Sequence, residues 1–96
     1  MSTIASTILR QLGGNRFIAM TSATCYADNN TLVVKFKGSR AANIMYVTLN
    51  GVDLYDVKIA KYKSLDVKVI KEAADVYGHM LVDIFESTTG LNTILY

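Results

Sequence analysis

The chain contains no proline, a single cysteine (Cys25) and a single histidine (His79). Without proline, nothing in the sequence marks a rigid hinge. One thiol cannot form an internal disulfide, so the cysteine content does not indicate an oxidising compartment. No apolar run approaches the roughly 20 residues that span a bilayer, and Met1–Ala5 lacks the basic region and apolar run of a signal peptide. We therefore expect a cytoplasmic protein that does not enter a membrane.

What the sequence does contain is enough apolar material for one core. With 96 residues, of which 51% are hydrophobic, a single domain spanning residues 1–96 is expected to fold without metal or disulfide crosslinks. The net charge of +2 is distributed unevenly. Residues 31–71 have a balance of +5, whereas residues 72–96 contain four acidic residues and neither Lys nor Arg. This asymmetry bears on any choice of partner.

The first part of the chain predicts a helix followed by strands. Apolar residues recur over residues 3–12 at a helical spacing, and Gly13 stands where a C-terminal cap belongs. The short apolar run Arg16–Ala23 is predicted as the first strand, and Asp28-Asn29-Asn30 as a turn. Residues 31–37 alternate between apolar and polar side chains, which is typical of a half-buried strand.

A hairpin is predicted around Asn50-Gly51, because a two-residue type I′ turn needs positive φ at both central residues. Its strands are expected at residues 44–49 and 52–62. In that register, however, the apolar residues of the second strand fall on the opposite face from those of the first. Either both faces are covered, or a bulge near Asp53 shifts the phase. We favour the bulge.

Two further elements complete the predicted fold. Alternation of apolar and charged residues predicts a fifth strand over residues 65–69, and helical spacing predicts a helix over residues 75–88. The order α-β-β-β-β-β-α is most simply satisfied by an α+β domain, an antiparallel sheet with both helices on one face. The apolar tail Leu91–Tyr96 is expected to pack against the domain or against a partner.

Several stretches resemble a known group of proteins. They are Gln11–Thr21 (QLGGNRFIAMT), Tyr46–Gly51 (YVTLNG), Asp53–Val57 (DLYDV) and Thr89–Leu91 (TGL). Together they resemble small proteins of tailed bacteriophages and prophages, a group to which no activity is attached. The resemblance spans most of the chain except residues 24–43. It implies a phage-encoded accessory protein, located in the host cell cytoplasm, and it assigns no functional residue.

Lysines are the most distinctive polar feature of the predicted sheet. Those on or beside its strands are Lys35, Lys37, Lys58, Lys61, Lys63, Lys68 and Lys71. Alternation with inward-facing residues predicts that four of them share the open face of the sheet: Lys35, Lys37, Lys58 and Lys68. Tyr62 is in phase with Lys58, and a basic sheet face with an aromatic ring can bind a phosphate backbone. Arg16, beside the Gly13-Gly14 turn, is a further candidate contact.

A simpler explanation competes with this hypothesis. Exposed strands often carry Lys to discourage edge pairing, and Asp56 and Asp66 would dilute the positive field. We regard this explanation as the more frequent one for such lysines.

Catalytic and metal-binding sites are not indicated. On the predicted helix, Asp75, His79, Asp83 and Glu86 form a stripe that could in principle hold a divalent metal, but it should face water, so a solvated helix face is preferred. Asp53 and Asp56 lie three residues apart and should point to opposite faces of a strand. A Cys25–His79 pair would require a coincidence of the fold. We therefore expect a non-enzymatic protein without a cofactor.

The sequence leaves two hypotheses of function open. The first is an accessory protein that binds nucleic acid through the lysine-rich sheet face. The second is a protein-interaction module, such as an inhibitor of a host factor or host defence, a virion component or a self-assembling subunit. Opposed charges on the sheet and the C-terminal helix suit contacts between proteins, so a homo-oligomer is one outcome of this second hypothesis.

Overall fold

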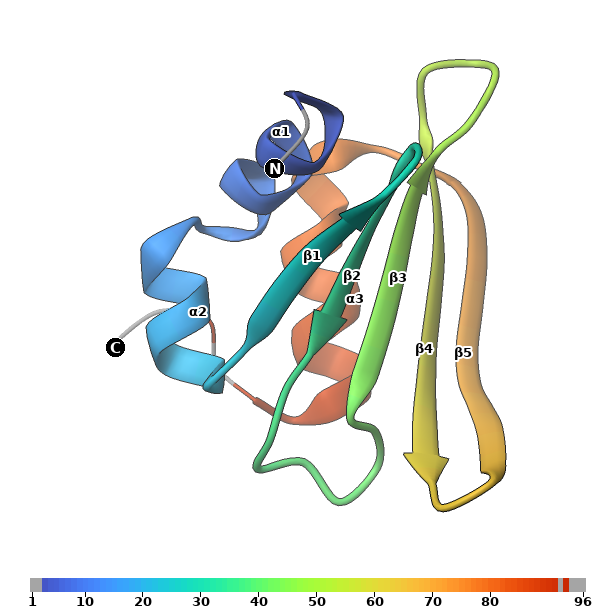
Figure 1. Cartoon of the computed structure of the whole chain (residues 1–96). Helices are drawn as coiled ribbons and strands as arrows, with labels where there is room; N and C mark the ends of the chain where they lie inside the picture. The colour runs from blue at the N-terminus through green and yellow to red at the C-terminus, as the bar shows by residue number, and fades with distance from the viewer. Residues whose placement is uncertain (1–2, 92, 94–96) are drawn as a thin grey trace.

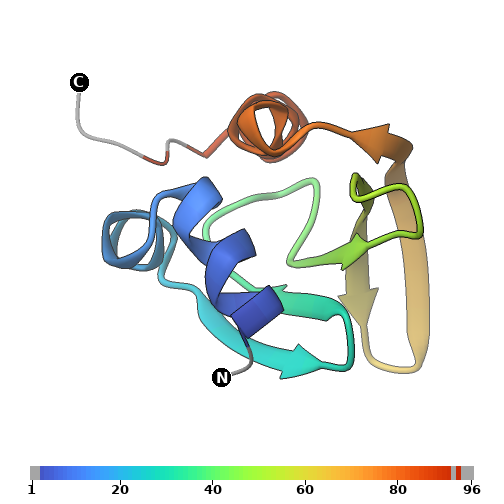
Figure 2. The ribbon, with the colours of Figure 1, turned by 90° about the horizontal axis from the view of Figure 1, so that it is seen from above.

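A computed structural model describes residues 3–91 and residue 93. The chain folds into two layers, a curved five-stranded antiparallel sheet and a layer of helices that covers one of its faces (Figures 1 and 2). The strands are adjacent in chain order: β1 Thr24–Asp28, β2 Thr31–Lys35, β3 Ile44–Leu49, β4 Tyr55–Lys63 and β5 Asp66–Val76. The helices are α1 Thr3–Leu12, α2 Asn15–Thr21, the 3₁₀ turn η1 Gly78–Met80 and α3 Leu81–Thr89. The predicted α+β class, with terminal helices on one face, is confirmed.

The N-terminal helical pair departs from the prediction. α1 buries Ala5, Ile8 and Leu12 along the expected stripe. Gly13 and Gly14 both have positive φ and reverse the chain, and the amide of Gly14 donates to the carbonyl of Leu9 at 2.9 Å. Most of the run predicted as the first strand, its residues 16–21, belongs to α2 instead.

The reason lies in which side chains of that run are buried. α2 buries Phe17 and Thr21, which are four residues apart and therefore share one helical face. The hydroxyl of Thr21 donates to the carbonyl of Phe17 at 2.8 Å, so the one buried hydroxyl is satisfied within the helix. A short apolar run does not distinguish helix from strand by periodicity alone. Within the described residues, no helix is both long and apolar enough to cross a membrane.

The true first strand is β1, which pairs with β2 across the predicted turn. Tyr26 lies opposite Val33 and Cys25 opposite Val34. Alternation therefore places Tyr26 on the face without helices and Cys25 against the core.

The Asn50-Gly51 hairpin has a longer loop than predicted. β3 pairs with β4 through Leu49 and Tyr55, so five residues form the connection instead of two. The side-chain carbonyl of Asn50 accepts from the amides of Val52 and Leu54 at 3.0 and 3.2 Å. Positive φ falls at Asp53 and not at Gly51. The prediction of a two-residue turn is thus wrong. The longer loop, and not a bulge, brings the apolar residues of β3 and β4 to the same face of the sheet.

β5 is longer than predicted and contains two irregularities. Its register against β4 shifts between Ile59 and Ala60 and again between Tyr55 and Val57. The strand extends to Val76, so the C-terminal helix begins later than residue 75. α3 ends at Thr89 and is capped by Gly90 as expected. Gly90 has a φ of 76°, and its backbone N–H donates a hydrogen bond to the carbonyl of Glu86. Of the predicted apolar tail, Leu91 packs against the core and Thr93 is buried; residues 92 and 94–96 lie outside the described part.

The core lies between the sheet and the helices. Phe85 of α3 is fully buried and meets Phe17 and Phe36 edge to face, each at 5.0 Å between ring centroids. A second, small buried cluster lies on the opposite face of the sheet and comprises Val33, Ile44 and Ala60, with Tyr46 packed against it. The face without helices is therefore curved enough to bury side chains of its own.

Candidate nucleic-acid interface

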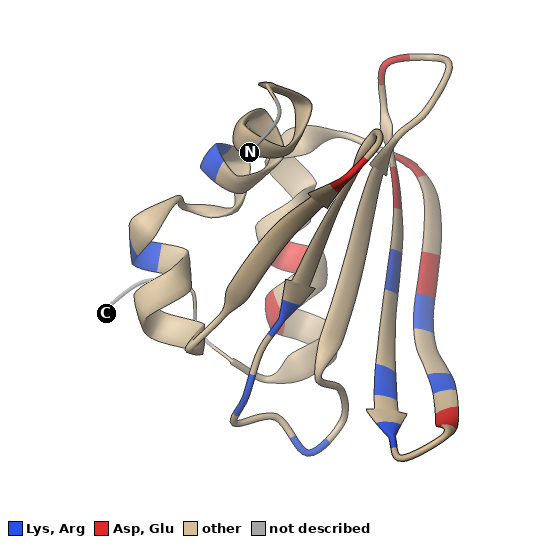
Figure 3. Ribbon diagram, in the orientation of Figure 1, with Lys and Arg blue, Asp and Glu red and all other residues tan. Residues whose placement is uncertain are grey.

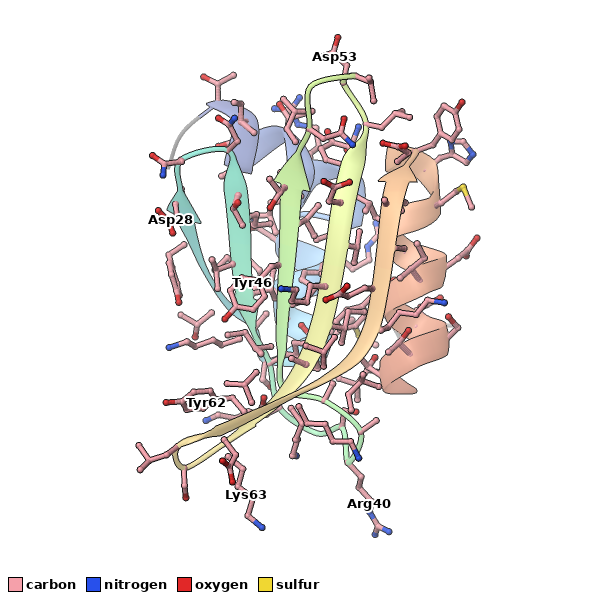
Figure 4. The ribbon with its side chains drawn as sticks, turned by 90° about the vertical axis from the view of Figure 1, so that its right-hand side faces the viewer. Asp28, Arg40, Tyr46, Asp53, Tyr62 and Lys63 are labelled. Carbon is pink, nitrogen blue, oxygen red and sulfur yellow. The ribbon has the colours of Figure 1, made fainter. Side chains whose placement is uncertain are left out.

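The sheet face that carries no helix, called here the open face, is the candidate site (Figure 4). Its side chains follow from the strand register. One row across the sheet holds Tyr26, Val33, Tyr46, Lys58 and Glu72. Further rows place Asp28 and Asp56 toward one end, and Lys35 and Ala60 toward the other. The first is called the upper end and the second the lower end, as in Figure 1.

A hollow of about 870 Å³ covers the upper half of the open face and continues down β5 to Val69 and Val67, which lie opposite Ala60 and Tyr62. It is called here the upper hollow. Its ionisable lining includes Asp28, Asp56 and Glu72, against Lys58. Lys58 and Glu72 approach to 3.8 Å, but both side chains are at least half exposed, so this ion pair contributes little to stability. Neighbouring hydroxyls of Thr31 and Thr48 share a hydrogen bond at 2.7 Å. The upper hollow is acidic on balance and does not suit a polyanion.

The lower half forms a second hollow of about 670 Å³ with the opposite character. It combines three lysines with three tyrosines: Lys35, Lys37, Lys61, Tyr26, Tyr46 and Tyr62. None of the described residues that line it is acidic. Tyr46 also lines the upper hollow and so marks the boundary between the two.

Charge is segregated along the strand direction in the rest of the sheet as well. Figure 3 shows Lys and Arg concentrated at the lower end and most acidic residues of the sheet at the upper end. The lower end includes the β2–β3 loop with Arg40 and the β4–β5 hairpin with Lys63, and both side chains extend from the bottom of the molecule (Figure 4). The upper end includes Asp53 in the β3–β4 loop (Figure 4). The field therefore changes sign from one end of the sheet to the other.

Asn43 holds the lower hollow together. Its side-chain amide donates to the carbonyl of Tyr62 at 2.7 Å, and the amide of Tyr62 donates back to the side-chain oxygen of Asn43 at 2.7 Å. The β4–β5 hairpin is thereby fixed to the start of β3. In the β2–β3 loop, the hydroxyl of Ser39 donates to the carbonyl of Thr89 at 2.7 Å and accepts from the amides of Ala41 and Ala42. Both walls of the hollow are thus anchored by hydrogen bonds.

Two of the three tyrosine rings are exposed on this scaffold, whereas Tyr46 is half-buried and packs against the small cluster of this face. Tyr26 is 43% exposed and Tyr62 is 51% exposed. The ammonium group of Lys35 lies 5.5 Å from the ring centroid of Tyr26, within the range of a cation–π contact. Aromatic faces and positive charges are therefore presented side by side.

The lysines predicted to share the open face are divided by the structure. Lys35 and Lys58 lie on that face, and Lys37 lines the lower hollow just beyond β2. Lys68 does not join them. It pairs with Lys61, out of phase with Tyr62, because the irregularity at Ile70 shifts β5 by one residue.

The remaining predicted contacts also separate. Lys61 and Tyr62 both line the lower hollow, although alternation along β4 directs their side chains to opposite faces of the sheet. Tyr62 therefore belongs to the open face, whereas Lys61 borders the hollow without belonging to that face. Lys63, at the end of β4, points away from Tyr62 at the hairpin tip (Figure 4). Arg16 is exposed on α2, in the helical layer on the far side of the sheet, and is not part of the open face.

Two tyrosines of the hollow were not predicted as site residues. Tyr26 fell outside every predicted strand because the first strand was expected at residues 16–23. The signal was present, since a hairpin folded about Asn29-Asn30 pairs Tyr26 with Val33 directly. A two-residue turn at Asn50-Gly51 would put Tyr46 opposite Tyr55, whereas the longer loop puts it opposite Lys58.

The other chemical candidates are separated by the fold. Asp75 is in β5, His79 in η1 and Asp83 in α3, so the predicted helical stripe does not form. His79 stacks on Tyr77 at 5.8 Å. Among the described residues, no group of three or more His, Cys, Asp or Glu side chains is placed to hold a metal ion.

Burial accounts for Cys25, and hydrogen bonds within the fold account for Asp56 and Asp75 near the β3–β4 loop. Burial raises the pKa of the Cys25 thiol, which favours the protonated form. Asp53 is in the loop, whereas Asp56 shares the side-chain amide of Asn50 with Asp75, at 3.1 and 2.8 Å. This amide bridges two carboxylates and ties the loop to both β4 and β5.

Comparison with models of protein families, with curated proteins and with solved structures gave no match to this chain. The candidate site therefore rests on the geometry of the open face.

Proposed function

We propose that the protein binds nucleic acid through the lower hollow. The observation that carries this proposal is the grouping of Lys35, Lys37 and Lys61 with three tyrosines in one hollow. Phosphates contribute most of the affinity of such interfaces through lysine and arginine contacts, and aromatic rings offer stacking surfaces for bases. No carboxylate among the described lining residues opposes a phosphate there.

The acidic upper hollow restricts where a polyanion can lie. Asp28, Asp56 and Glu72 repel phosphates from that half of the open face. A bound nucleic-acid strand is expected to extend instead from the lower hollow toward the β2–β3 loop and the β4–β5 hairpin, where Arg40 and Lys63 add positive charge. The contact surface is therefore an end of the sheet and not the whole face predicted from alternation.

Charge reversal at two sites tests the proposal. In the variant Lys35→Glu/Lys61→Glu, binding of a fluorescein-labelled oligonucleotide at low salt should fall by at least about tenfold, because two phosphate contacts become repulsive. The matched control is Arg10→Glu/Arg16→Glu, which makes the same change in net charge in the helical layer. Equal loss of binding in both variants, measured by fluorescence anisotropy, would show only a general charge effect and refute the site.

The broader biological role extends this proposal. The resemblance of the N-terminal turn and the central hairpin to phage proteins supports a phage-encoded accessory protein that acts in the host cytoplasm by binding, without catalysis. Recovery of the gene from a phage or prophage, next to genes of nucleic-acid metabolism, would support this role. A neighbourhood without phage genes would contradict it.

A protein partner is the second candidate, and the β4–β5 hairpin is the observation that favours it. Leu65 at its tip is 97% exposed, and Val67 and Val69 are about half exposed. Exposed apolar side chains of this kind can anchor a protein contact. Stable association of the pure protein, or binding to a host protein, that is lost in Leu65→Ser while oligonucleotide binding is absent would favour this candidate over the first.

A further inference from the structure

We infer that the lower hollow selects single-stranded over double-stranded nucleic acid, with unpaired bases stacked on Tyr26, Tyr46 and Tyr62. This inference rests on the proposed function and specifies its substrate class. Three properties of the hollow support it: the placement of the rings, the volume they enclose and the position of the charges around them.

The rings are placed inside the hollow and not along a flat surface. Tyr26 and Tyr46 occupy the same row of the open face, with Val33 between them. Neighbouring strands are about 4.8 Å apart, so the two tyrosines are separated by roughly 10 Å across the sheet. Tyr62 enters from the hairpin below, where Asn43 fixes its backbone at both the amide and the carbonyl. The three rings thus border one space from three strands.

A base in a duplex cannot use these rings. Within a double helix both faces of each base are covered by neighbouring base pairs, and only the edges are open in the grooves. Stacking on a tyrosine requires an unpaired base or one that has been removed from the stack. A duplex could therefore contact the lysines at the rim but would leave the aromatic surfaces unused.

The volume of the hollow supports the same conclusion. About 670 Å³ lies within the range of roughly 300–1,000 Å³ for pockets that hold small molecules, which is room for a few unpaired bases. The floor is formed in part by Ile44, which belongs to the buried cluster on this face. An apolar floor with aromatic walls favours the faces of bases, whereas the lysines are the groups that meet phosphates.

The positions of the lysines fit a short single strand of nucleic acid. Lys35 belongs to β2, Lys37 follows it and Lys61 belongs to β4, so positive charges lie on both sides of Tyr46 of β3. The Lys35 ammonium group, 5.5 Å from the Tyr26 ring, can contact a phosphate while a base stacks next to that ring.

The experiment compares one sequence in two forms. A fluorescein-labelled oligonucleotide of mixed sequence and about 20 nucleotides, long enough to stay annealed, is titrated with the protein both as a single strand and annealed to its complement. The single strand should bind at least about tenfold more tightly than the duplex. It should also quench the intrinsic fluorescence of the protein, which comes from tyrosine because the chain contains no tryptophan.

Ring removal separates stacking from charge. Tyr26→Leu/Tyr62→Leu should weaken single-strand binding by about tenfold or more and leave duplex binding and the salt dependence nearly unchanged. Tyr26→Phe/Tyr62→Phe should retain binding, since the rings remain. The control is Tyr77→Leu, which removes an equally exposed tyrosine at the end of β5, outside both hollows.

The outcomes distinguish the inference from the proposed function. Single-strand preference that disappears in the double leucine variant and persists in the double phenylalanine variant supports the inference. Equal affinity for both forms, with loss in Lys35→Glu/Lys61→Glu, overturns the inference and leaves the proposed function standing. If neither the single strand nor the duplex binds the wild type more tightly than it binds Lys35→Glu/Lys61→Glu, both the inference and the proposed function are overturned.

Discussion

The salt dependence of binding gives the sharpest measure of how many charges the lower hollow contributes. Each phosphate contact with a single strand adds about −0.7 to the slope of log K against log salt concentration. With contacts from Lys35, Lys37 and Lys61, the expected slope is about −2. Substitution Lys37→Ala removes one contact and should reduce the slope to about −1.4. A fourfold rise in salt then weakens the wild type about sixteenfold and the variant about sevenfold.

Fluorescence anisotropy at several salt concentrations measures both slopes with one labelled oligo-dT. Lys37 suits this test because its side chain is exposed and lies beyond the end of β2, so its loss should not disturb the fold. Arg10→Ala, an exposed change on α1, should retain the wild-type slope. A wild-type slope near zero, or an unchanged slope in Lys37→Ala, would refute the assignment of phosphate contacts to this hollow.

Two further predictions concern the scaffold. Phe85→Ala should lower the free energy of unfolding by about 3–5 kcal/mol, because it leaves a cavity between Phe17 and Phe36, and a loss below about 1 kcal/mol in urea unfolding would contradict the packing. Burial of Cys25 predicts slow alkylation in the folded protein at mildly alkaline pH and fast alkylation in denaturant. Because the raised pKa means that the folded state holds this proton more tightly, stability should decline as pH rises above the ordinary pKa of a thiol, and Cys25→Ala should lack that part of the decline.

Periodicity predicted the elements in which one face is fully buried. The alternation of Leu32, Val34 and Phe36 and the stripe of Ala5, Ile8 and Leu12 both face the same core, so pattern and burial agree. The run from residue 16 to 23 has no such pattern. Its conformation is decided by the packing of Phe17 against Phe85, which is a contact between distant parts of the chain. Local sequence carries no record of that contact, and the strand prediction failed there.

Side-chain hydrogen bonds explain the second group of errors. In the sequence, Asn50 followed by Gly51 predicts a two-residue turn. In the structure, the side chain of Asn50 instead forms hydrogen bonds with two backbone amides of the loop and with two carboxylates, one of them on β5. The irregularity near Ile70 likewise changes which face Lys68 occupies. A shift of one residue between two paired strands reverses the face of the side chains on one side of the shift relative to those on the other. Membership of the candidate site therefore depended on register, which alternation alone does not determine.

The segregation of charge along the sheet limits how a ligand can cross it. In an antiparallel sheet, the loop after β2 and the hairpin after β4 meet at the same end, so basic residues from two distant segments are brought together there. A nucleic acid that followed the strand direction would pass from the lower hollow into the acidic upper hollow and meet Asp56 and Glu72. One that crosses the strands, from Lys35 of β2 to Lys61 of β4, keeps its phosphates in positive potential throughout. Under the proposed function, the bound strand must therefore run across the sheet, and neutralising the upper end with Asp56→Asn/Glu72→Gln should lengthen the stretch of single strand that the protein covers.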